Sequence, residues 1–540
     1  MKRKWMNNYF MLCFFIMALV LSGCTSSANQ NASGNQPNTD SETNTKSERQ
    51  EETTASKKSG GTLRIIIGDD AIKALGYNPE IRSIGDLMVS ATALETLGRY
   101  NTKGTLTPFL ADSWQIDTAA NTITITIKEG IKFSDGTDFN AEAVKWNLEQ
   151  YRLSKKPNFN ETDTQSIEAP DATTVVIKLN TWDIGMMDTI LTAVKMASPT
   201  AFNEHGKDWA MENPVGTGPF VMEKFVKGVS VKFKKNENYW QEGMPYLDGV
   251  EWKMITDSQT ASAAMSAGEA DVYYNTSAKV AQDLQANFEV IKFSGFGAFG
   301  PAIYPSGGNP DSPWADERVR QALSLAIDRE AIVKTLAFGY GTATSQYSSP
   351  GLDHYNDEIK PEFNPDKAKQ LLVDAGYADG FKTQVIFANS PESADLYTAI
   401  QSYLGNIGVE LELAPVDGAK FREISGADGS WEGLIGYVFR VAPDTSWDMI
   451  RNLASFGTNA RSVETYPELD ELMKQSRTVP DSETYKTAVL ELQQKLFGEK
   501  VSAIPLYLGA NTTIKAKGVE GDGMTTTFLT DWTPESAKMH

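Results

Sequence analysis

The sequence predicts an α/β fold with mixed sheets, because segments typical of strands and of helices interleave along its 540 residues. Residues 122–127 (TITITI) alternate apolar and polar side chains, as a half-buried strand does. Residues 364–376 begin with Asn-Pro, carry apolar residues at helical spacing and end at Gly, which predicts a capped helix. A chain of this length can bury a large core.

The first half of the chain contains strands and two marked helices. The run of β-branched residues in 60–67 predicts a buried strand. Residues 88–97 read as a helix that leads into Arg99, Tyr100 and a turn at Gly104. Residues 113–117 should pair with 122–127 across a short turn, and Asn140 should cap a helix. Alternation at 175–179 predicts a further strand.

The second half continues the alternation. Residues 289–293 and 409–413 are expected to be strands, and 316–327 and 396–404 helices. We find no internal repeat in the sequence. Strands and helices therefore alternate over the whole chain, as an α/β protein requires.

The N-terminus has the pattern of an export signal. Three basic residues, 2–4, precede an apolar run over 9–21 and the small pair Ser22-Gly23. The run is shorter than the roughly 20 residues that a spanning helix needs. Cys24 follows directly, and the segment resembles the bacterial lipobox. The resemblance implies cleavage before Cys24 and its linkage to a diacylglycerol, hence a lipid anchor on the extracytoplasmic side of the cell membrane. A plain signal peptide or a membrane helix are the alternatives.

Residues 25–59 differ in composition from the rest. They are almost wholly polar, with Pro37 the only proline and no aromatic residue. Such a segment buries too little apolar surface to order itself. We therefore expect a flexible tether between the lipid and the folded body.

Charge and residue usage exclude several classes of function. The net charge of −20 argues against a nucleic-acid partner, which favours basic surfaces. Cys13 lies inside the signal, so the processed chain cannot form an internal disulfide. The three histidines show no metal-ligand spacing, and no G-x-S-x-G motif is present. Residues 295–300 spell G-x-G-x-x-G, but prolines and glycines follow where a dinucleotide site needs a helix. We expect no enzyme activity, no resident metal and no cofactor.

Five blocks of sequence resemble the peptide- and nickel-binding solute receptors of bacterial ABC importers (family 5: the oligopeptide-, dipeptide- and nickel-binding type). They stand in family order along nearly the whole processed chain, and Gly216 and Gly218 in one of them suit a turn with unusual backbone angles. The blocks are 106–114, 130–144, 216–220 with 231–240, 317–330 and 364–377.

The resemblance implies a two-lobed periplasmic-binding-protein-like fold (type II, class C) with mixed sheets and an extra subdomain in the first lobe. The lobes would close over the ligand like a hinge. We expect the chain to cross between lobes at 295–300 and to return at 504–507. The expected division is a signal over 1–23, lipidated Cys24 and tether over 24–59, first lobe over 60–299 plus 505–540, and second lobe over 300–504.

The resemblance also implies the function. The protein would capture peptides or peptide-like small solutes outside the membrane and deliver them, as a monomer, to ABC permease subunits with a cytoplasmic ATPase. One alternative is a receptor of the same family for nickel, a metallophore or an opine. Another is a lipoprotein that senses peptides without importing them.

The expected ligand site lies partly on residues 436–447. In peptide-binding members an Asp of the second lobe, shortly before a Pro, pairs with the peptide's α-amino group. No acid stands upstream of Pro443 here, and Arg440 is nearby instead. A buried Arg would suit a carboxylate, which favours an anionic ligand such as an opine or a metal chelate, unless Asp444 supplies the acid. The candidate ligand-binding residues are Tyr100, Lys195, Tyr437, Phe439, Arg440, Asp444 and Trp447, with core packing the alternative for the aromatic ones.

Overall fold

The computed structural model describes most of the chain after residue 59. The described residues are 60–68, 72–101, 103–154, 159–293, 295, 297–426, 429–459, 462–509, 511–521 and 534–540. The predicted signal, Cys24 and the tether lie outside them. Residues 57–540 form one compact unit.

A seven-stranded mixed sheet contains the first strand of the body. Its order is β12-β20-β11-β1-β10-β9-β8, with β1 parallel to both of its neighbours. Helix α1 packs on one face of this sheet, and α6 and α7 pack on the other. The strands are β1 (Thr62–Ile67), β8 (Phe220–Val226), β9 (Ser230–Lys235), β10 (Gly249–Met254), β11 (Val272–Thr276), β12 (Glu289–Phe293) and β20 (Asn511–Lys515).

A four-stranded antiparallel sheet is inserted in the sequence between β1 and β8. Its order is β4-β5-β7-β6. The alternation of residues 122–127 places Ile123, Ile125 and Ile127 against helix α2, and each buried Ile contributes about 1.5–3 kcal/mol. The strands are β4 (Ala111–Asp117), β5 (Thr122–Ile127), β6 (Thr164–Glu168) and β7 (Thr174–Leu179).

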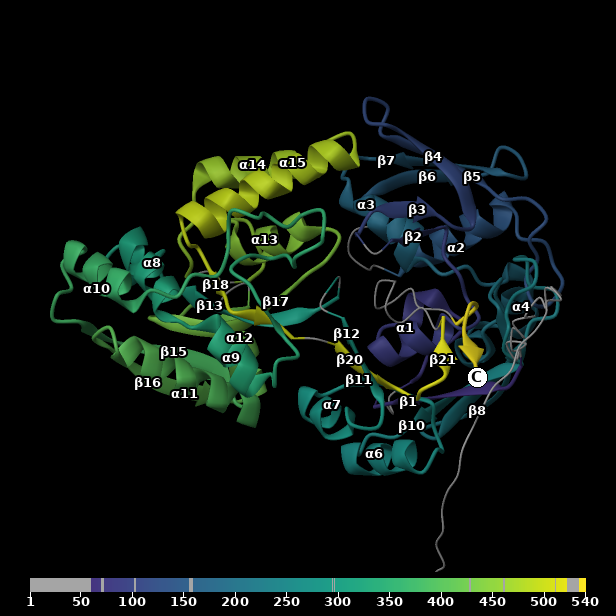
Figure 1. The fold of residues 1–540 in the computed structure, drawn as a ribbon. Helices are drawn as coiled ribbons and strands as arrows, with labels where there is room; N and C mark the ends of the chain where they lie inside the picture. The colour runs from purple at the N-terminus through teal and green to yellow at the C-terminus, as the bar shows by residue number, and fades with distance from the viewer. Residues whose placement is uncertain are drawn as a thin grey trace, which may run out of the picture. The chain divides into compact units, whose positions relative to one another are not determined.

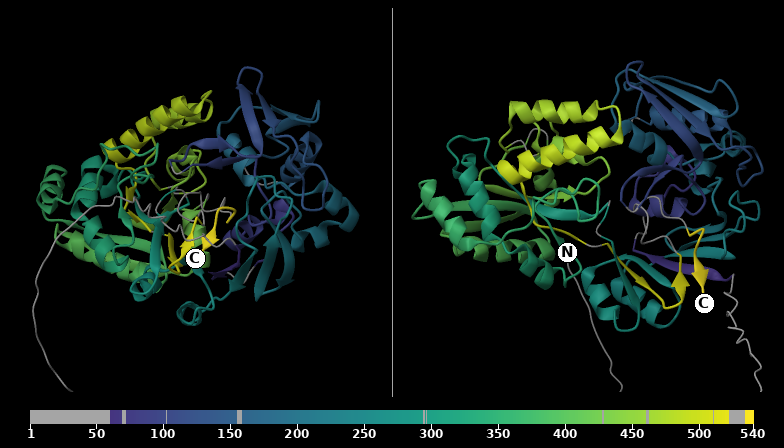
Figure 2. Two further views of the ribbon diagram at one scale, coloured as in Figure 1. Left: turned by 45° about the vertical axis from the view of Figure 1, so that its right-hand side comes forward. Right: turned by 45° about the horizontal axis from the view of Figure 1, so that its top comes forward.

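A five-stranded mixed sheet forms the rest of the body. Its order is β16-β15-β17-β13-β18. Helices α8–α11 pack on one face and α12–α15 on the other, and α14 and α15 lie side by side in all views (Figures 1 and 2). The strands are β13 (Phe299–Pro305), β15 (Phe381–Ala388), β16 (Val409–Val416), β17 (Leu434–Arg440) and β18 (Ile504–Pro505).

Short ribbons and helices complete the described structure. The ribbons are β2 (Gly98–Tyr100) with β3 (Leu106–Pro108), β14 (Thr342–Ala343) with β19 (Tyr507–Leu508), and β21 (Val519–Glu520) with β22 (Lys538–Met539). The α-helices are α1 (Ile84–Ser90), α2 (Ala141–Leu153), α3 (Gly185–Asp188), α4 (Pro199–His205), α5 (Lys207–Glu212), α6 (Ser258–Ser266), α7 (Ala278–Leu284), α8 (Glu317–Ala326), α9 (Arg329–Leu336), α10 (Pro365–Asp374), α11 (Pro391–Gly405), α12 (Gly418–Ser425), α13 (Thr445–Leu453), α14 (Pro467–Arg477) and α15 (Ser482–Gln493). Short η segments are η1 (Asn78–Glu80), η2 (Thr189–Ala193), η3 (Pro313–Ala315) and η4 (Gln494–Glu499).

Most of the sequence-based elements are confirmed. Asn140, Asp316 and Asn364 each cap the predicted helix through a side-chain oxygen that accepts a backbone N–H. β4 pairs with β5 as expected, and Asp117 lies opposite Thr122. Residues 295–300 lead into strand β13 rather than a helix.

The helix predicted over 88–97 is wrong. Helix α1 spans Ile84–Ser90, and residues 91–97 connect it to β2 without helical structure. Ser83 caps α1 and forms a capping box with Asp86, which fixes the helix start four residues before the predicted one. Buried residues continue after the helix because 92–97 pass through the core as a connection.

The expectation for Gly216 and Gly218 is also corrected. Neither residue has a positive φ. A side chain at either position would collide with the backbone of Ala93. The glycines are required by close backbone approach rather than by unusual dihedral angles.

The sheets are linked by two segments of the chain. Residues 293–299 connect β12 to β13, and residues 508–511 connect β19 to β20. Gly509 N–H donates to Phe299 O at 2.9 Å, so the chain lies side by side at these two residues. Strands β18 and β19 still pair with β13 and β14, which places the return to the seven-stranded sheet after residue 508. The predicted domain boundaries remain a prediction.

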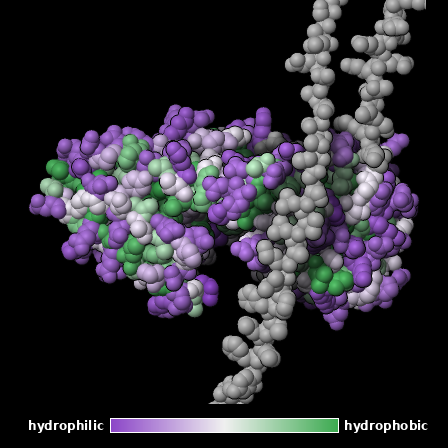
Figure 3. Space-filling model, turned by 60° about the horizontal axis from the view of Figure 1, so that its bottom comes forward, coloured by the Kyte–Doolittle hydropathy of each residue, from purple (hydrophilic) through white to green (hydrophobic). Residues whose placement is uncertain are grey.

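The face drawn in Figure 3 carries mainly hydrophilic side chains with small, separate apolar patches. Among the described residues, none of the helices has the length and apolar character needed to cross a bilayer.

Candidate functional site

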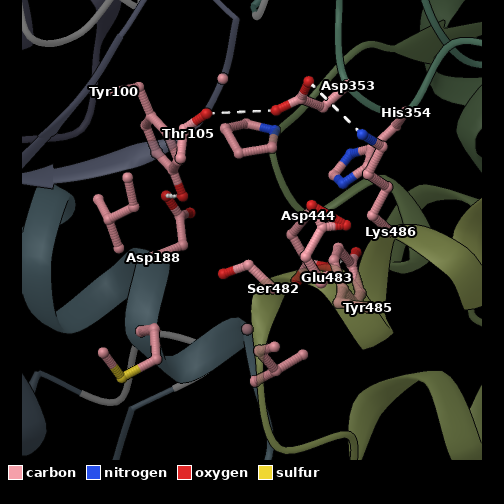
Figure 4. A pocket seen from close by; sticks show the side chains of 16 residues that line it. Tyr100, Thr105, Asp188, Asp353, His354, Asp444, Ser482, Glu483, Tyr485 and Lys486 are labelled. Atoms are coloured by element: carbon pink, nitrogen blue, oxygen red, sulfur yellow. Dashed lines mark hydrogen bonds and ion pairs between the residues drawn. The ribbon is translucent and has the colours of Figure 1, made fainter. Parts of the chain in front are cut away.

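A cavity of about 200 Å³ lies between side chains from distant parts of the sequence. Strands β2 and β3, helix α3, the 353–354 loop, the start of α13 and the start of α15 all contribute to its wall (Figure 4). The lining residues are Tyr100, Gly104, Thr105, Leu106, Ile184, Gly185, Met187, Asp188, Asp353, His354, Pro443, Asp444, Ser482, Glu483, Tyr485 and Lys486. The cavity is therefore lined by elements beside the four-stranded sheet and by helices packed on the five-stranded one.

Asp188 and Tyr100 form one side of the cavity. Tyr100 is nearly buried on β2, and its hydroxyl donates to Asp188 Oδ1 at 2.8 Å. The Thr192 hydroxyl can donate its proton to the same oxygen at 3.0 Å or to Asp188 O at 2.9 Å. Burial raises the pKa of Asp188 above its usual range, although both hydroxyl groups favour the ionised form.

Asp444 forms the opposite side. It precedes helix α13, and its Oδ1 accepts hydrogen bonds from Arg477, from the Tyr485 hydroxyl at 2.8 Å and from Ser446 Oγ at 3.3 Å. Burial opposes the ionisation of Asp444, but the Arg477 charge and these hydrogen bonds outweigh it and hold its pKa below the usual range. Asp444 is therefore an ionised carboxylate that already has a cationic partner.

His354 contributes a neutral ring beside Asp444. Burial lowers the pKa of His354 to about 4, so the ring is uncharged at neutral pH. The Thr445 hydroxyl donates to Ala442 O at 2.8 Å, so Nδ1 of His354 donates to Thr445 Oγ1 at 3.2 Å. Nε2 is then the nitrogen that carries the lone pair.

Direct contacts join the two sides of the cavity wall at its edges. Thr105 Oγ1 donates to Asp353 Oδ2 at 3.2 Å. On another edge, the Trp182 indole N–H donates to Val479 O at 2.9 Å, and Ile184 N–H donates to Arg477 O at 2.8 Å. These contacts hold segments that are 248 to 297 positions apart in the sequence.

The structure places two of the predicted ligand-binding residues, Tyr100 and Asp444, on this cavity. Lys195 is buried away from its lining. Trp447 follows Asp444 on α13 but is not part of the lining either, and the Arg477 guanidinium lies 5.7 Å from the centre of its ring.

The three candidates on β17 also lie outside the cavity lining. Phe439 is fully buried and stacks on Tyr347 with 4.8 Å between the ring centres. Tyr437 stacks on Phe421 at 5.6 Å. The Arg440 side chain is 40% exposed, and its Nε lies 3.5 Å from Asp448 Oδ2. The expectation of an anionic ligand depended on a buried Arg440, and this exposure removes its basis.

Sequence reasoning missed several residues of the site: Asp188, His354, Tyr485 and Lys486. Asp188 had a signal that could have found it, because it is the one acid within the apolar run 184–191. An acid in such a run is costly unless it has a role or a partner. The other three stand on polar stretches that carry no comparable signal.

The charges of the cavity suit a cationic group better than an anionic one. Its lining contains four carboxylates and Lys486, whose Nζ lies 3.8 Å from Asp353 Oδ1. Leu106, Ile184, Met187 and Pro443 add apolar wall, where ionic contacts are less screened than in water. In the part of the chain that the structure describes, no three His, Cys, Asp or Glu side chains are grouped as metal ligands.

Comparisons with known proteins agree with the fold. HbpA2 from Haemophilus parasuis superposes with a TM-score of 0.78 at 21% identity, over 89% of this chain and 100% of that one. DppA from Helicobacter pylori, solved in complex with the peptide STSA, superposes with a TM-score of 0.64 at 20% identity, over 89% of this chain and 98% of that one. Both similarities concern the fold.

Sequence comparison identifies the family. The glutathione-binding protein GsiB of Salmonella typhimurium is 33% identical over 340 residues, which cover 60% of this chain. The match spans 64% of the length of GsiB, slightly less than two thirds. The family model for the middle part of bacterial extracellular solute-binding proteins, family 5, matches residues 105–460, well over half of the chain. The protein is therefore a member of the family 5 bacterial extracellular solute-binding proteins.

Proposed function

We propose that this protein is the solute receptor of an ABC importer and that it captures peptides or peptide-like small solutes outside the membrane. It would pass them to permease subunits powered by a cytoplasmic ATPase. The reaction is binding without covalent chemistry. The ligand would stabilise the closed arrangement by contacting both sides of the cavity.

The observation that carries this proposal is the cavity between β2, β3 and α3 on one side and α13 and α15 on the other. A site shared by two groups of elements couples ligand binding to their closure, because the ligand gains its full contacts only when both are present. The family match covers both groups only in part, since it ends at residue 460, before α15.

The sheet membership supports a division into two lobes. The first lobe would contain the seven-stranded and four-stranded sheets, and the second the five-stranded sheet. The linking segments 293–299 and 508–511 would then act as the hinge. In this proposal the second crossing lies a few residues later than the sequence suggested.

The proposed ligand class rests on the charges of the cavity and on the relatives. Glutathione, which GsiB binds by its name, and the peptide STSA are both peptide-like molecules with an ammonium group. The carboxylates of the cavity suit such a group and disfavour an anionic opine or metal chelate. The two alternatives, a metallophore receptor and a sensory lipoprotein, are distinguished by the uptake experiment below.

We also propose that Cys24 carries the lipid that retains the protein at the cell membrane. A diacylglyceryl group provides the two chains that stable anchoring needs. The Cys24→Ser variant should leave the membrane fraction while wild type stays in it. Equal membrane retention of both would refute the anchor and leave the binding role unaffected.

Growth and uptake experiments test the receptor role. A strain that lacks the gene should lose uptake of radiolabelled di- or tripeptides, and the wild-type gene should restore it. Unchanged peptide uptake together with lost uptake of a nickel chelate would favour the metallophore receptor. Unchanged uptake of both, with altered peptide-dependent gene expression, would favour the sensor.

A further inference from the structure

We propose that Asp188, on helix α3, is the residue that binds the ammonium group of the captured solute. The inference rests on the proposed function and makes it more specific, because it limits the ligands to solutes with a free amine. The contact between the ligand ammonium and a protein carboxylate would then lie on the side of the cavity opposite Asp444.

Asp444 does not meet the requirements for this role. Its Oδ1 is occupied by Arg477, Tyr485 and Ser446. The Arg477 guanidinium balances its charge, and the Arg477 side chain is only 9% exposed, so the pair is not easily separated. An ammonium group placed beside Asp444 would also face the Arg477 cation.

Asp188 has the opposite environment. Its Oδ1 accepts from two neutral hydroxyl groups, those of Tyr100 and Thr192. Its Oδ2 accepts no hydrogen bond from any residue that the structure describes. Within the same described residues, no Lys, Arg or His nitrogen lies at ion-pair distance from Asp188. It is thus a carboxylate on a cavity wall with one oxygen still available.

The surroundings of Asp188 destabilise its ionised form, so a cation bound at Oδ2 would be strongly favoured. A carboxylate removed from water is destabilised unless it is hydrogen-bonded and paired with a cation. Burial and the nearby Asp444 charge both disfavour the ionised form of Asp188, and together they raise its pKa although the Arg440 charge acts in the opposite direction with a smaller effect. A ligand ammonium at Oδ2 would reverse both effects, so binding and ionisation of Asp188 support each other.

The neighbouring side chains would orient the carboxylate. The hydroxyl of Tyr100, on β2, is hydrogen-bonded to Asp188 Oδ1. The hydroxyl of Thr192, one helical turn after Asp188, is within hydrogen-bond distance of the same atom. Met187 and Ile184 add apolar wall nearby. An N-acylated ligand would place a bulky neutral amide against this wall and lose the charge interaction.

The other carboxylates of the cavity are weaker candidates. Asp353 accepts a hydrogen bond from Thr105 and lies 3.8 Å from Lys486 Nζ. Glu483 lies at the exposed start of α15. Asp395 is exposed on helix α11 and lies outside the cavity lining, so Asp395→Asn, which makes the same chemical change, is the matched control for Asp188→Asn.

Calorimetric titration of the full-length protein in mild detergent tests the inference. The probes are a mixture of free di- and tripeptides and the same mixture after N-acetylation. Wild type should bind the free peptides and bind the acetylated ones at least about 10-fold more weakly. Asp188→Asn should weaken binding of free peptides about 10- to 100-fold, with a small effect on acetylated ones. Asp395→Asn should change either Kd less than about 3-fold.

The outcomes separate this inference from the proposed function. If wild type binds free and acetylated peptides equally, or if Asp188→Asn binds free peptides as wild type does, the assignment of Asp188 is wrong and the receptor role stands. If wild type binds neither mixture, the peptide-receptor proposal and this inference both fail. If Asp188→Asn shows no cooperative thermal transition and is therefore not folded, the Tyr100→Phe variant replaces it in the titrations. Removing that hydroxyl should selectively weaken free peptides, and an unselective effect would overturn the assignment.

Discussion

Arg477 links the two sides of the cavity through Asp183. Its Nη2 lies 2.6 Å from Asp183 Oδ1, while its Nη1 bonds Asp444. Asp183 follows the four-stranded sheet, whereas Arg477 ends helix α14 beside the five-stranded one. One guanidinium thus joins segments 294 positions apart with the planar geometry that Lys cannot reproduce.

Replacing Arg477 should therefore destabilise the fold. Arg477→Met leaves Asp444 and Asp183 without their cation and should lower the free energy of unfolding by about 3 kcal/mol. Asp183→Asn keeps the Arg477–Asp444 pair and should cost only about 1 kcal/mol. Urea unfolding followed by tryptophan fluorescence measures both, and equal losses in the two variants would contradict the account.

Gly185 should tolerate no side chain. A Cβ at this position would collide with the Arg477 guanidinium and with Asp444 Oδ2. Gly185→Ala should therefore force the two sides apart and lower both stability and ligand affinity. The control is Gly405→Ala on helix α11, where the added methyl meets no atom within 4 Å. That change should stabilise slightly, by about 0.4–1 kcal/mol, and a destabilised control would argue against the packing explanation.

Acid should weaken the binding of amine-bearing solutes. The pKa of Asp188 is raised by burial, so its ionised form is lost earlier on acidification than that of an exposed Asp. Affinity should be highest above this raised pKa and fall as the pH drops through it. Titrations of one free peptide across this range measure the effect.

Other groups near Asp188 act in the same titration, so a variant is needed as the control. Tyr100 and Thr192 are neutral, and the Arg440 charge favours the ionised form of Asp188. Asp444 keeps a lowered pKa, and His354 gains a proton only near its pKa of about 4. Asp188→Asn should therefore bind weakly with a flatter pH profile. Parallel profiles for wild type and Asp188→Asn would speak against a titrating Asp188.

Glu95 should impose a pH dependence on stability. Burial, opposed by the Arg99 charge and by hydrogen bonds from Tyr239, Trp240 and Thr217, raises its pKa to about 7 from 4.5. The folded state then holds a proton that the unfolded state releases between these values. Its contribution to stability should therefore decrease as the pH rises from about 4.5 to about 7, by roughly 1–3 kcal/mol.

The Glu95→Gln variant isolates this contribution. Gln lacks the titration but places an NH₂ group among hydrogen-bond donors, so the variant should be less stable and its stability less dependent on pH. Urea unfolding at several pH values gives the difference between the two slopes. The same slope for both proteins would show that Glu95 does not titrate in this range.

Local patterns were enough to predict much of the fold. The strict alternation in 122–127 and the Asn-Pro start of α10 each depend on neighbours within one turn or strand. The misplaced helix at 88–97 shows the limit of this reasoning. Its apolar residues are buried by the surrounding sheets, and burial alone does not distinguish a helix from a connection.

The site was harder to predict because its residues meet only in the folded chain. Tyr100, Asp188, His354, Asp444 and Lys486 come from five separate segments. Nothing in the sequence around Asp444 indicates that its carboxylate forms an ion pair with Arg477. Likewise, the exposed position of Arg440 follows from the orientation of β17, which the aromatic pattern 437–447 did not fix.

Native mass spectrometry of the full-length protein, purified from a medium that contains a digest of free peptides, tests the central claim most directly. We expect one bound peptide per protein chain, each with an unmodified amino group, and its loss in Asp188→Asn but not in Asp395→Asn. A metal-chelate mass, or no bound solute in wild type even after incubation with the peptide digest, would contradict it.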